Sequence, residues 1–212
     1  MTRKKAQLRP ARADLNLAFA PTPQRPLRTR MRDLPQDTHF EPHQHEWGQL
    51  ACCGHGLLQV FVQAPDSGHD TSVILPPQRA VWIPPRAMHS IVAIEAAQSR
   101  AVYVDPGVIP AHWQGVRVVA VSPLLQAVVD AMEQPSYQDD AAAHHALAVL
   151  VRHELEHTAE LPLGVPLPSQ QRGDRRLRSL CEAVLSEPGA HATLAGWASH
   201  CGASERTLTR LF

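Results

Sequence analysis

The stretch Ala80-Val-Trp-Ile-Pro-Pro-Arg-Ala-Met-His-Ser-Ile-Val-Ala-Ile94 contains two short apolar runs that a proline pair divides. Runs of this length between turn residues are typical of β-strands. The same pattern continues in both directions and predicts strands at residues 27–34, 49–53, 57–63, 71–75, 80–83, 90–94, 100–104 and 116–121. Many short strands at close spacing predict an antiparallel sandwich or barrel over residues 26–121.

Helical patterns replace the strand pattern after residue 121. Ser122 and Pro123 form a helix start, and a second helix is expected from Asp139 or Asp140 to His157. We expect these two helices to pair as a hairpin over residues 122–160. Three prolines and a glycine in residues 161–171 oppose regular structure, so residues 161–172 are predicted to be a linker. A further helix is expected to start near Asp174.

The last twenty residues, Thr193 to Phe212, predict two short helices joined by a turn at Gly202. Ser204 is placed to cap the second helix. Its apolar side chains are expected to face inward: Leu208, Leu211 and Phe212. The opposite face then carries Arg206, Thr209 and Arg210, where a groove of DNA could be reached. An ordinary surface helical hairpin is the alternative to a DNA-reading element.

Composition and charge restrict the cellular compartment and the partners that are expected for the protein. No stretch approaches the roughly 20 apolar residues of a membrane span, and no secretory signal follows the basic start, so a cytoplasmic protein without a membrane partner is expected. The four cysteines lack C-x-x-C spacing and are expected to be reduced. Residues 1–32 carry nine Lys and Arg against one Asp. Residues 1–25 are predicted to be a disordered basic and proline-rich arm, either simply solvated or assisting on DNA phosphates.

Several histidines have the spacing of a binding site. His43 and His45 lie on one face of an extended segment, Gln49 follows four residues later, and His89 lies on a later strand. Such a set inside a barrel suits a divalent metal ion. The alternative is a polar pocket in which the histidines bind one another or an organic ligand. Arg79, Trp82 and Tyr103 are candidates to line the same cavity.

A second histidine motif lies at residues 153–157, where His-Glu-Leu-Glu-His fits the H-E-x-x-H pattern of zinc proteases. No convincing third ligand follows it. A solvated helix end, with His157 near the carbonyl terminus, is the preferred interpretation.

Three segments together resemble a known family: His43-Gln-His-Glu-Trp-Gly-Gln-Leu50, Arg79-Ala-Val-Trp-Ile-Pro-Pro-Arg-Ala-Met-His89, and residues 194–212. They resemble the AraC-type transcription regulators that carry an amino-terminal cupin sensor. The resemblance implies a mainly β fold, a cupin-like double-stranded β-barrel, followed by α-helices and a partial helix-turn-helix domain at residues 173–212. It also implies a small-molecule effector, DNA as partner, and homodimerisation through the helices after the barrel.

Matched to the family motifs, the histidine set falls at the metal-ligand positions: His43, His45, Gln49 and His89. Gln49 stands where metal cupins usually have Glu, and Arg86 where the second motif commonly has Gly. Arg206, Thr209 and Arg210 fall where such regulators contact bases, and Ser204 where a helix start approaches phosphate. Family members continue through a connecting helix and a second helix-turn-helix, so the chain is expected to be truncated within its DNA-binding domain.

Two other classes of function remain open from the sequence. A cupin metalloenzyme, an oxygenase or isomerase, would use the same histidines to hold a metal with open positions for substrate. It leaves the terminal helices unexplained, and no clear catalytic acid or base is evident, so no catalytic residue is assigned. The second alternative class is a sensor and dimerisation module that does not bind DNA. We expect a regulator rather than an enzyme.

Overall fold

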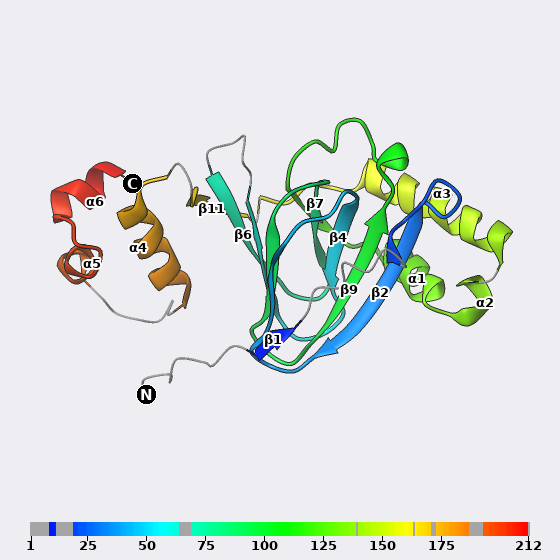
Figure 1. Ribbon diagram of the computed structural model, residues 1–212, viewed down its shortest axis with the longest axis horizontal. Coiled ribbons are helices and arrows are strands. Elements are labelled where there is room, and N and C mark those ends of the chain that lie inside the picture. The colour runs from blue at the N-terminus through cyan, green and yellow to red at the C-terminus, as the bar shows by residue number, and fades with distance from the viewer. Residues whose placement is uncertain are drawn as a thin grey trace. The chain divides into compact units, whose positions relative to one another are not determined.

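The described residues fall into two units that share one β-strand. The computed structural model describes residues 9–11, 19–63, 69–138, 140–162, 164–170, 173–186 and 193–211. The first unit comprises Met1–Val62 and Ser72–Gly164, and the second comprises Gln63–Thr71 and Val165–Phe212. Figure 1 shows the helices and strands of both units and labels many of them.

Two sheets contain all the strands of the described residues. The six-stranded sheet has the order β1 (Arg9–Ala11), β3 (Thr38–His43), β8 (His89–Ala93), β5 (Leu58–Val62), β6 (His69–Leu75) and β11 (Val165–Pro168). The five-stranded sheet has the order β10 (Arg117–Ala120), β7 (Arg79–Ile83), β4 (Gly48–Cys53), β9 (Ala97–Val104) and β2 (Leu27–Leu34). All eight predicted strands are present, and the predicted class, a β-barrel-like fold followed by helices, is confirmed.

Three strands lie where none was predicted. β1 forms within the predicted disordered arm because it pairs in parallel with β3 and supplies partners for the backbone of that strand. β3 itself was missed because its sequence, Thr-His-Phe-Glu-Pro-His, lacks apolar alternation. β11 lies within the predicted linker, since proline is compatible with extended backbone at a sheet edge. The predictions of a disordered arm and an irregular linker were therefore wrong for these residues.

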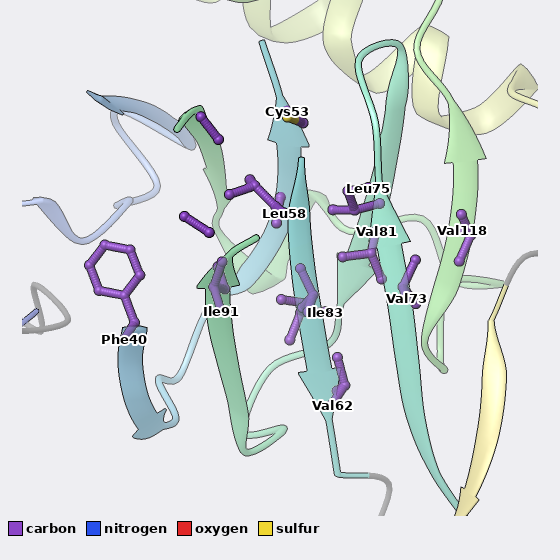
Figure 2. Packing of buried hydrophobic residues seen from close by; sticks show 14 of the residues in the cluster. Phe40, Cys53, Leu58, Val62, Val73, Leu75, Val81, Ile83, Ile91 and Val118 are labelled. Atoms are coloured by element: carbon purple, nitrogen blue, oxygen red, sulfur yellow. The ribbon is translucent and has the colours of Figure 1, made fainter. Parts of the chain in front are cut away.

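Apolar side chains from both sheets fill much of the space between them within the first unit. Figure 2 shows this inner core, to which β3, β5 and β8 contribute Phe40, Leu58 and Ile91. β4 and β7 supply their odd-numbered residues to the same core because strand side chains alternate between faces. The inner core includes Ala51, Cys53, Val81 and Ile83. Burial of this surface is the main favourable contribution to folding of the barrel.

The other face of the five-stranded sheet is covered by helices. These are α1 (Pro123–Met132) and α3 (Ala141–His157), with the short helices η2 (Pro106–Val108) and α2 (Pro135–Gln138) nearby in sequence. Ser122 caps α1 as predicted, and Asp140, one of the two expected starts, caps α3 through its carboxylate. Leu50, Trp82 and Val129 share this outer core. The helical hairpin is thus packed on the barrel within the first unit.

Gly48 at the start of β4 lies directly against Trp82. A Cβ atom at position 48 would lie 2.2 Å from the Cη2 atom of Trp82, whose ring is fully buried and meets the Trp113 ring at 5.1 Å. We expect Gly48→Ala to lower the free energy of unfolding by about 1–3 kcal/mol, because the ring has no room to retreat. Urea denaturation measures this loss. Gly115→Ala is the matched control: nothing lies within 4 Å of its added Cβ, so an equal loss there would contradict the steric explanation.

The described residues of the second unit form three helices, α4 (Arg175–Ser186), α5 (Leu194–His200) and α6 (Glu205–Leu211). Asp174 caps α4, since its carboxylate accepts hydrogen bonds from the backbone N–H groups of residues 176 and 177. Leu180, Ala198 and Leu208, one from each helix, form the core of this unit. No helix of the described residues is both long and apolar enough to cross a membrane.

A largely buried ion pair joins the start of β6 to α4 within the second unit. Arg178 donates to the carboxylate of Asp70 and, at 2.7 Å, to the carbonyl of Pro168. The Asp70 carboxylate also accepts from the backbone N–H of Gln170 at 3.2 Å. The two charged side chains are 15% and 7% exposed. One guanidinium thus joins β6, β11 and α4.

Candidate functional site

A pocket opens on the inner face of the barrel, between the two sheets. Its empty volume is about 450 Å³ when the open mouth is included, and only a small part of this space is enclosed. Residues of β2, β3, β4, β8 and β9 line it, with one residue from the segment before β4: Arg30, Arg32, Phe40, His43, His45, Gln49, Ile91, Ser99, Ala101 and Tyr103. The structure therefore brings together His43, His45 and Gln49 of the predicted site, and Tyr103 with them.

The three predicted histidines form one cluster. His43 ends β3 and faces His89 at the start of β8 in the strand register. Their ring centroids are 4.2 Å apart, and the His45 ring lies 5.0 Å from that of His89 and 6.2 Å from that of His43. His89 is 1% exposed and lies behind the other two rings rather than in the pocket wall.

Each imidazole of the cluster is oriented by a backbone carbonyl. The Nδ1 atom of His43 donates to the carbonyl oxygen of Glu41 at 2.8 Å. The Nδ1 atom of His45 donates to the carbonyl oxygen of Trp47 at 2.7 Å. The Nδ1 atom of His89 donates to the carbonyl oxygen of Ala87 at 2.9 Å. A carbonyl oxygen only accepts, so the proton of a neutral ring lies on Nδ1 in all three. The three Nε2 atoms are therefore left as acceptors, which is the arrangement of histidines that bind metals.

Two Nε2 atoms have unusual surroundings. That of His89 is buried and has no hydrogen-bond partner among the described residues. That of His45 lies 2.9 Å from the Oε1 atom of Gln49, so two acceptors face each other unless the Gln49 amide is turned to present its NH₂ group. A bound cation, or hydrogen-bond donors from a bound ligand, would satisfy the Nε2 atoms of His45 and His89.

Burial keeps these imidazoles neutral. It lowers the pKa of His43 and His45, and it lowers the pKa of His89 to about 3, with a smaller contribution from the neighbouring His43. Neutral imidazoles are ready to accept hydrogen bonds or to bind a metal without releasing a proton.

The donor chemistry of the cluster suits a divalent metal ion, but the spacing is less suitable. Three imidazole nitrogens and an amide oxygen are the ligand types of zinc, iron or nickel sites. Within the described ranges, however, no three His, Cys, Asp or Glu side chains are arranged to hold one ion. Small shifts of the rings would be needed before His43, His45 and His89 could share a metal.

Two expected pocket residues lie elsewhere, and two unexpected ones line the pocket. Trp82 points to the outer core because it alternates with Val81 and Ile83 along β7, and Arg79 at the strand start is also absent from the pocket wall. Arg30 and Arg32 line the pocket instead. The alternation Arg-Thr-Arg-Met-Arg at residues 28–32 was the available signal, since every second residue faces the same side of a strand.

Arg86, at the position where the family motif commonly has glycine, adopts a φ of 65°. Pro85 precedes it, and Ala87 donates a backbone hydrogen bond to Pro84 across the turn. Proline followed by a residue of positive φ is the pattern of a type II turn, which explains the glycine preference. The backbone N–H of Arg86 also donates to the carbonyl of His45 at 2.8 Å, so this turn supports the segment that carries the pocket histidine.

The terminal helices have the predicted helix-turn-helix layout. Thr193 caps α5, Gly202 follows it with a φ of 62°, and the Ser204 hydroxyl accepts from the backbone N–H of Thr207 at 3.1 Å to cap α6. Leu208 is fully buried, as predicted, whereas the Leu211 side chain and Phe212 lie outside the described residues. The exposed side of α6 carries Arg206, Thr209 and Arg210 at helical spacing.

The H-E-x-x-H motif lies on α3 and has structural roles. The rings of His153 and His157 are 4.3 Å apart, but Glu154 accepts a hydrogen bond from the Ser122 hydroxyl, and Leu155 is buried in the outer core. The Nδ1 atom of His157 donates to the carbonyl of His153 at 2.8 Å. Glu154 thus joins α3 to the start of α1.

Comparison with known proteins identifies relatives along most of the chain. The sequence profile of the AraC-like ligand binding domain matches residues 28–194. The HTH-type transcriptional regulator NimR of Escherichia coli strain K12 is 25% identical over 170 residues, which are 80% of this chain and 58% of that protein. The chain therefore spans less than two thirds of the length of this relative.

Solved structures show more distant likeness. The apo form of a ToxT variant from Vibrio cholerae aligns over 87% of this chain and 73% of its own, with 10% identity and a TM-score of 0.42. KdgF from Halomonas sp. aligns over 40% of this chain and 72% of its own, with 23% identity and a TM-score of 0.34.

Proposed function

Because the chain belongs to the family of AraC-like ligand binding domains, we propose that it is an effector-responsive transcription regulator that binds DNA through α5 and α6. The family match over residues 28–194 carries this proposal. The helix-turn-helix layout of the second unit supports it independently, since three polar side chains of α6 lie exposed on one side. We therefore expect a cytoplasmic protein to which no catalytic residue is assigned.

The pocket of the first unit is the proposed effector site. His43, His45 and Gln49 line it, and His89 supports them from behind. In a metal-bound form the same four residues would hold a divalent ion, which supplies a positive centre for an effector oxygen. Equilibrium dialysis against Zn²⁺ tests this form: we expect one ion bound per chain and weaker binding by His89→Gln. If the wild-type chain bound no Zn²⁺, the metal-bound form would be excluded and the pocket would be a site for an organic effector alone.

α6 is the proposed DNA-contacting helix. Arg206 and Arg210 can each pair with the O6 and N7 atoms of guanine, and Thr209 lies between them. The backbone near Ser204, at the start of α6, is placed to approach a phosphate.

Selection from a pool of random duplex DNA tests the regulator proposal. We expect the chain to enrich a defined sequence motif, with an affinity that falls linearly as the logarithm of the salt concentration rises. Enrichment without salt dependence, or no binding at low salt, would overturn the proposal. The control is the same chain with α6 disrupted by Leu208→Asp, which removes the helix-turn-helix core and leaves the barrel pocket unchanged.

α3 is the proposed dimerisation helix. Its outer side exposes apolar surface, with Val149 at 55% and Leu150 at 38% exposure. An apolar helix side beside charged residues is the usual form of a helix-helix interface. We expect sedimentation equilibrium to show a dimer that Val149→Asp converts to monomer, while Arg152→Gln on the same helix leaves the dimer intact. A wild-type monomer at all concentrations would contradict this assignment.

A further inference from the structure

A second cavity lies outside the barrel, where α3 packs on the five-stranded sheet. Its wall is formed by the start of β2, the end of β9, η2 and one side of α3, and we call it the α3 cavity. It encloses about 120 Å³. All of its lining residues belong to the first unit, and the described lining residues of the α3 cavity and of the barrel pocket do not overlap.

The strands β2 and β9 form the floor of the α3 cavity. Leu27 and Val104 are partners in the register of the two strands and are 2% and 1% exposed. The backbone N–H of Asp105 donates to the carbonyl of Pro26 at 2.8 Å just beyond this pair. Tyr103, the residue before Val104, lines the barrel pocket instead. Because strand side chains alternate, the two cavities lie on opposite faces of one sheet.

One side of α3 closes the cavity with small and apolar side chains. Ala148, Val151 and Leu155 recur at helical spacing and line the α3 cavity. Val151 and Leu155 are almost fully buried. His145 and Arg152 are the polar residues among the described lining residues, and both are exposed, so they lie at the mouth. The interior of the cavity is therefore lined by apolar side chains.

This lining favours an uncharged apolar molecule. A water molecule in a cavity needs two to four polar partners, and the interior side chains of the α3 cavity offer none. A charged group would lose its hydration without replacement, since Arg152 at the mouth already pairs with the carboxylate of Glu156 at 2.8 Å.

The size of the α3 cavity limits the occupant further. An engineered apolar cavity of roughly 150 Å³ stays dry and binds benzene or xenon. The α3 cavity, at about 120 Å³, is of the same order. A helix of another chain is about 10 Å across and cannot enter such a space. The occupant that fits is a single small molecule.

We propose that the α3 cavity is a second ligand site, which binds a small uncharged apolar molecule of about the size of one benzene ring. This site goes beyond the proposed function, because the effector pocket lies on the other face of the sheet. A ligand in the α3 cavity contacts Leu27 and Val104 on the sheet and Val151 and Leu155 on the helix. Its binding stabilises the packing of α3 on the barrel.

Titration of the full chain with fluorobenzene, followed by fluorine NMR, tests the site. We expect saturable binding with a dissociation constant on the order of 0.1–1 mM, because burial of one apolar ring is the whole driving force. Benzoate at equal concentration should not displace the probe. Displacement by benzoate would overturn the uncharged class. Absence of saturable binding would overturn the site, also where a side chain from a second copy of the chain fills the cavity.

A cavity-filling variant locates the binding. We expect Ala148→Leu to weaken fluorobenzene binding at least about tenfold, because the added side chain occupies the cavity, and to leave the free energy of unfolding unchanged or higher. Ala146→Leu is the matched control, since Ala146 is exposed on the same helix and should bind the probe as the wild type does. Wild-type affinity in Ala148→Leu, or a lower free energy of unfolding, would show that the space is not there.

Hydrogen exchange of the wild-type chain provides a readout that needs no variant. Saturating fluorobenzene should slow exchange in α3, because the ligand binds only while the helix is packed on the sheet. Exchange in α4, α5 and α6 should not change and serves as the internal control. Unchanged exchange in α3 would contradict the site.

Discussion

Replacing Arg178 with methionine is expected to lower the free energy of unfolding of the second unit by about 3–5 kcal/mol, the usual effect of removing one partner of a buried ion pair. Arg178→Met leaves the carboxylate of Asp70 buried beside the single N–H of Gln170. It also leaves the carbonyl of Pro168 without its donor. The helical unit has a small core, so a loss of this size is a large part of its stability.

Hydrogen exchange followed by mass spectrometry measures this effect where it occurs. We expect faster exchange in α4, α5 and α6, with the strands of the inner core unchanged. Arg152→Met is the matched control, because Arg152 and Glu156 form an exposed i,i+4 pair on α3 that contributes little. Unchanged exchange in α4 of Arg178→Met would show that the ion pair does not stabilise this unit.

Alanine at Arg206 and Arg210 is expected to remove most of the sequence preference of DNA binding. Each bidentate contact between arginine and guanine contributes about 1–3 kcal/mol of discrimination, so the double variant loses on the order of a hundredfold or more between a selected motif and random DNA. Neither side chain takes part in the core of the second unit. Binding curves on the selected motif and on a scrambled duplex, at fixed salt, measure the ratio.

Lysine variants separate recognition from charge in the same assay. Arg206→Lys and Arg210→Lys keep the positive charge, so we expect the salt dependence to stay near that of the wild type while the preference for the motif falls. If the alanine variants reduced binding to both duplexes equally, the arginines would be phosphate contacts and α6 would not be the base-reading helix.

Strong local patterns made much of the fold predictable. Apolar runs between turn residues located eight strands, and the caps at Ser122, Asp140 and Asp174 depend only on neighbouring residues. β1 and β11 are short and contain proline, and β3 lacks apolar alternation, so no local pattern located these three strands. Trp82 was predicted to line the pocket, but its side chain faces the outer core. The strand register decides whether a side chain faces the inside or the outside of a barrel, and the sequence pattern does not give the register.

The candidate site was partly predictable for the same reason. The spacing of His43, His45 and Gln49, with His89 on a later strand, was sufficient to predict their meeting. The arginines of β2 were noted only as charge, because the strand register decides that Arg30 and Arg32 face the pocket. The Asp70 and Arg178 pair joins residues 108 positions apart, which no local pattern reports.

The division of β6 between two units has a consequence for how such a gene can be rearranged. The chain passes from one unit to the other after Val62, after Thr71 and after Gly164. An exchange of gene segments at the third junction alone would transfer α4 to α6 without the nine residues that contain Asp70, and Arg178 would arrive in the new host without its acid. Recombination at this single junction could therefore not transfer α4, α5 and α6 together with the carboxylate that pairs with Arg178. A barrel that acquires these helices must already carry, or later evolve, a carboxylate in its own sixth strand.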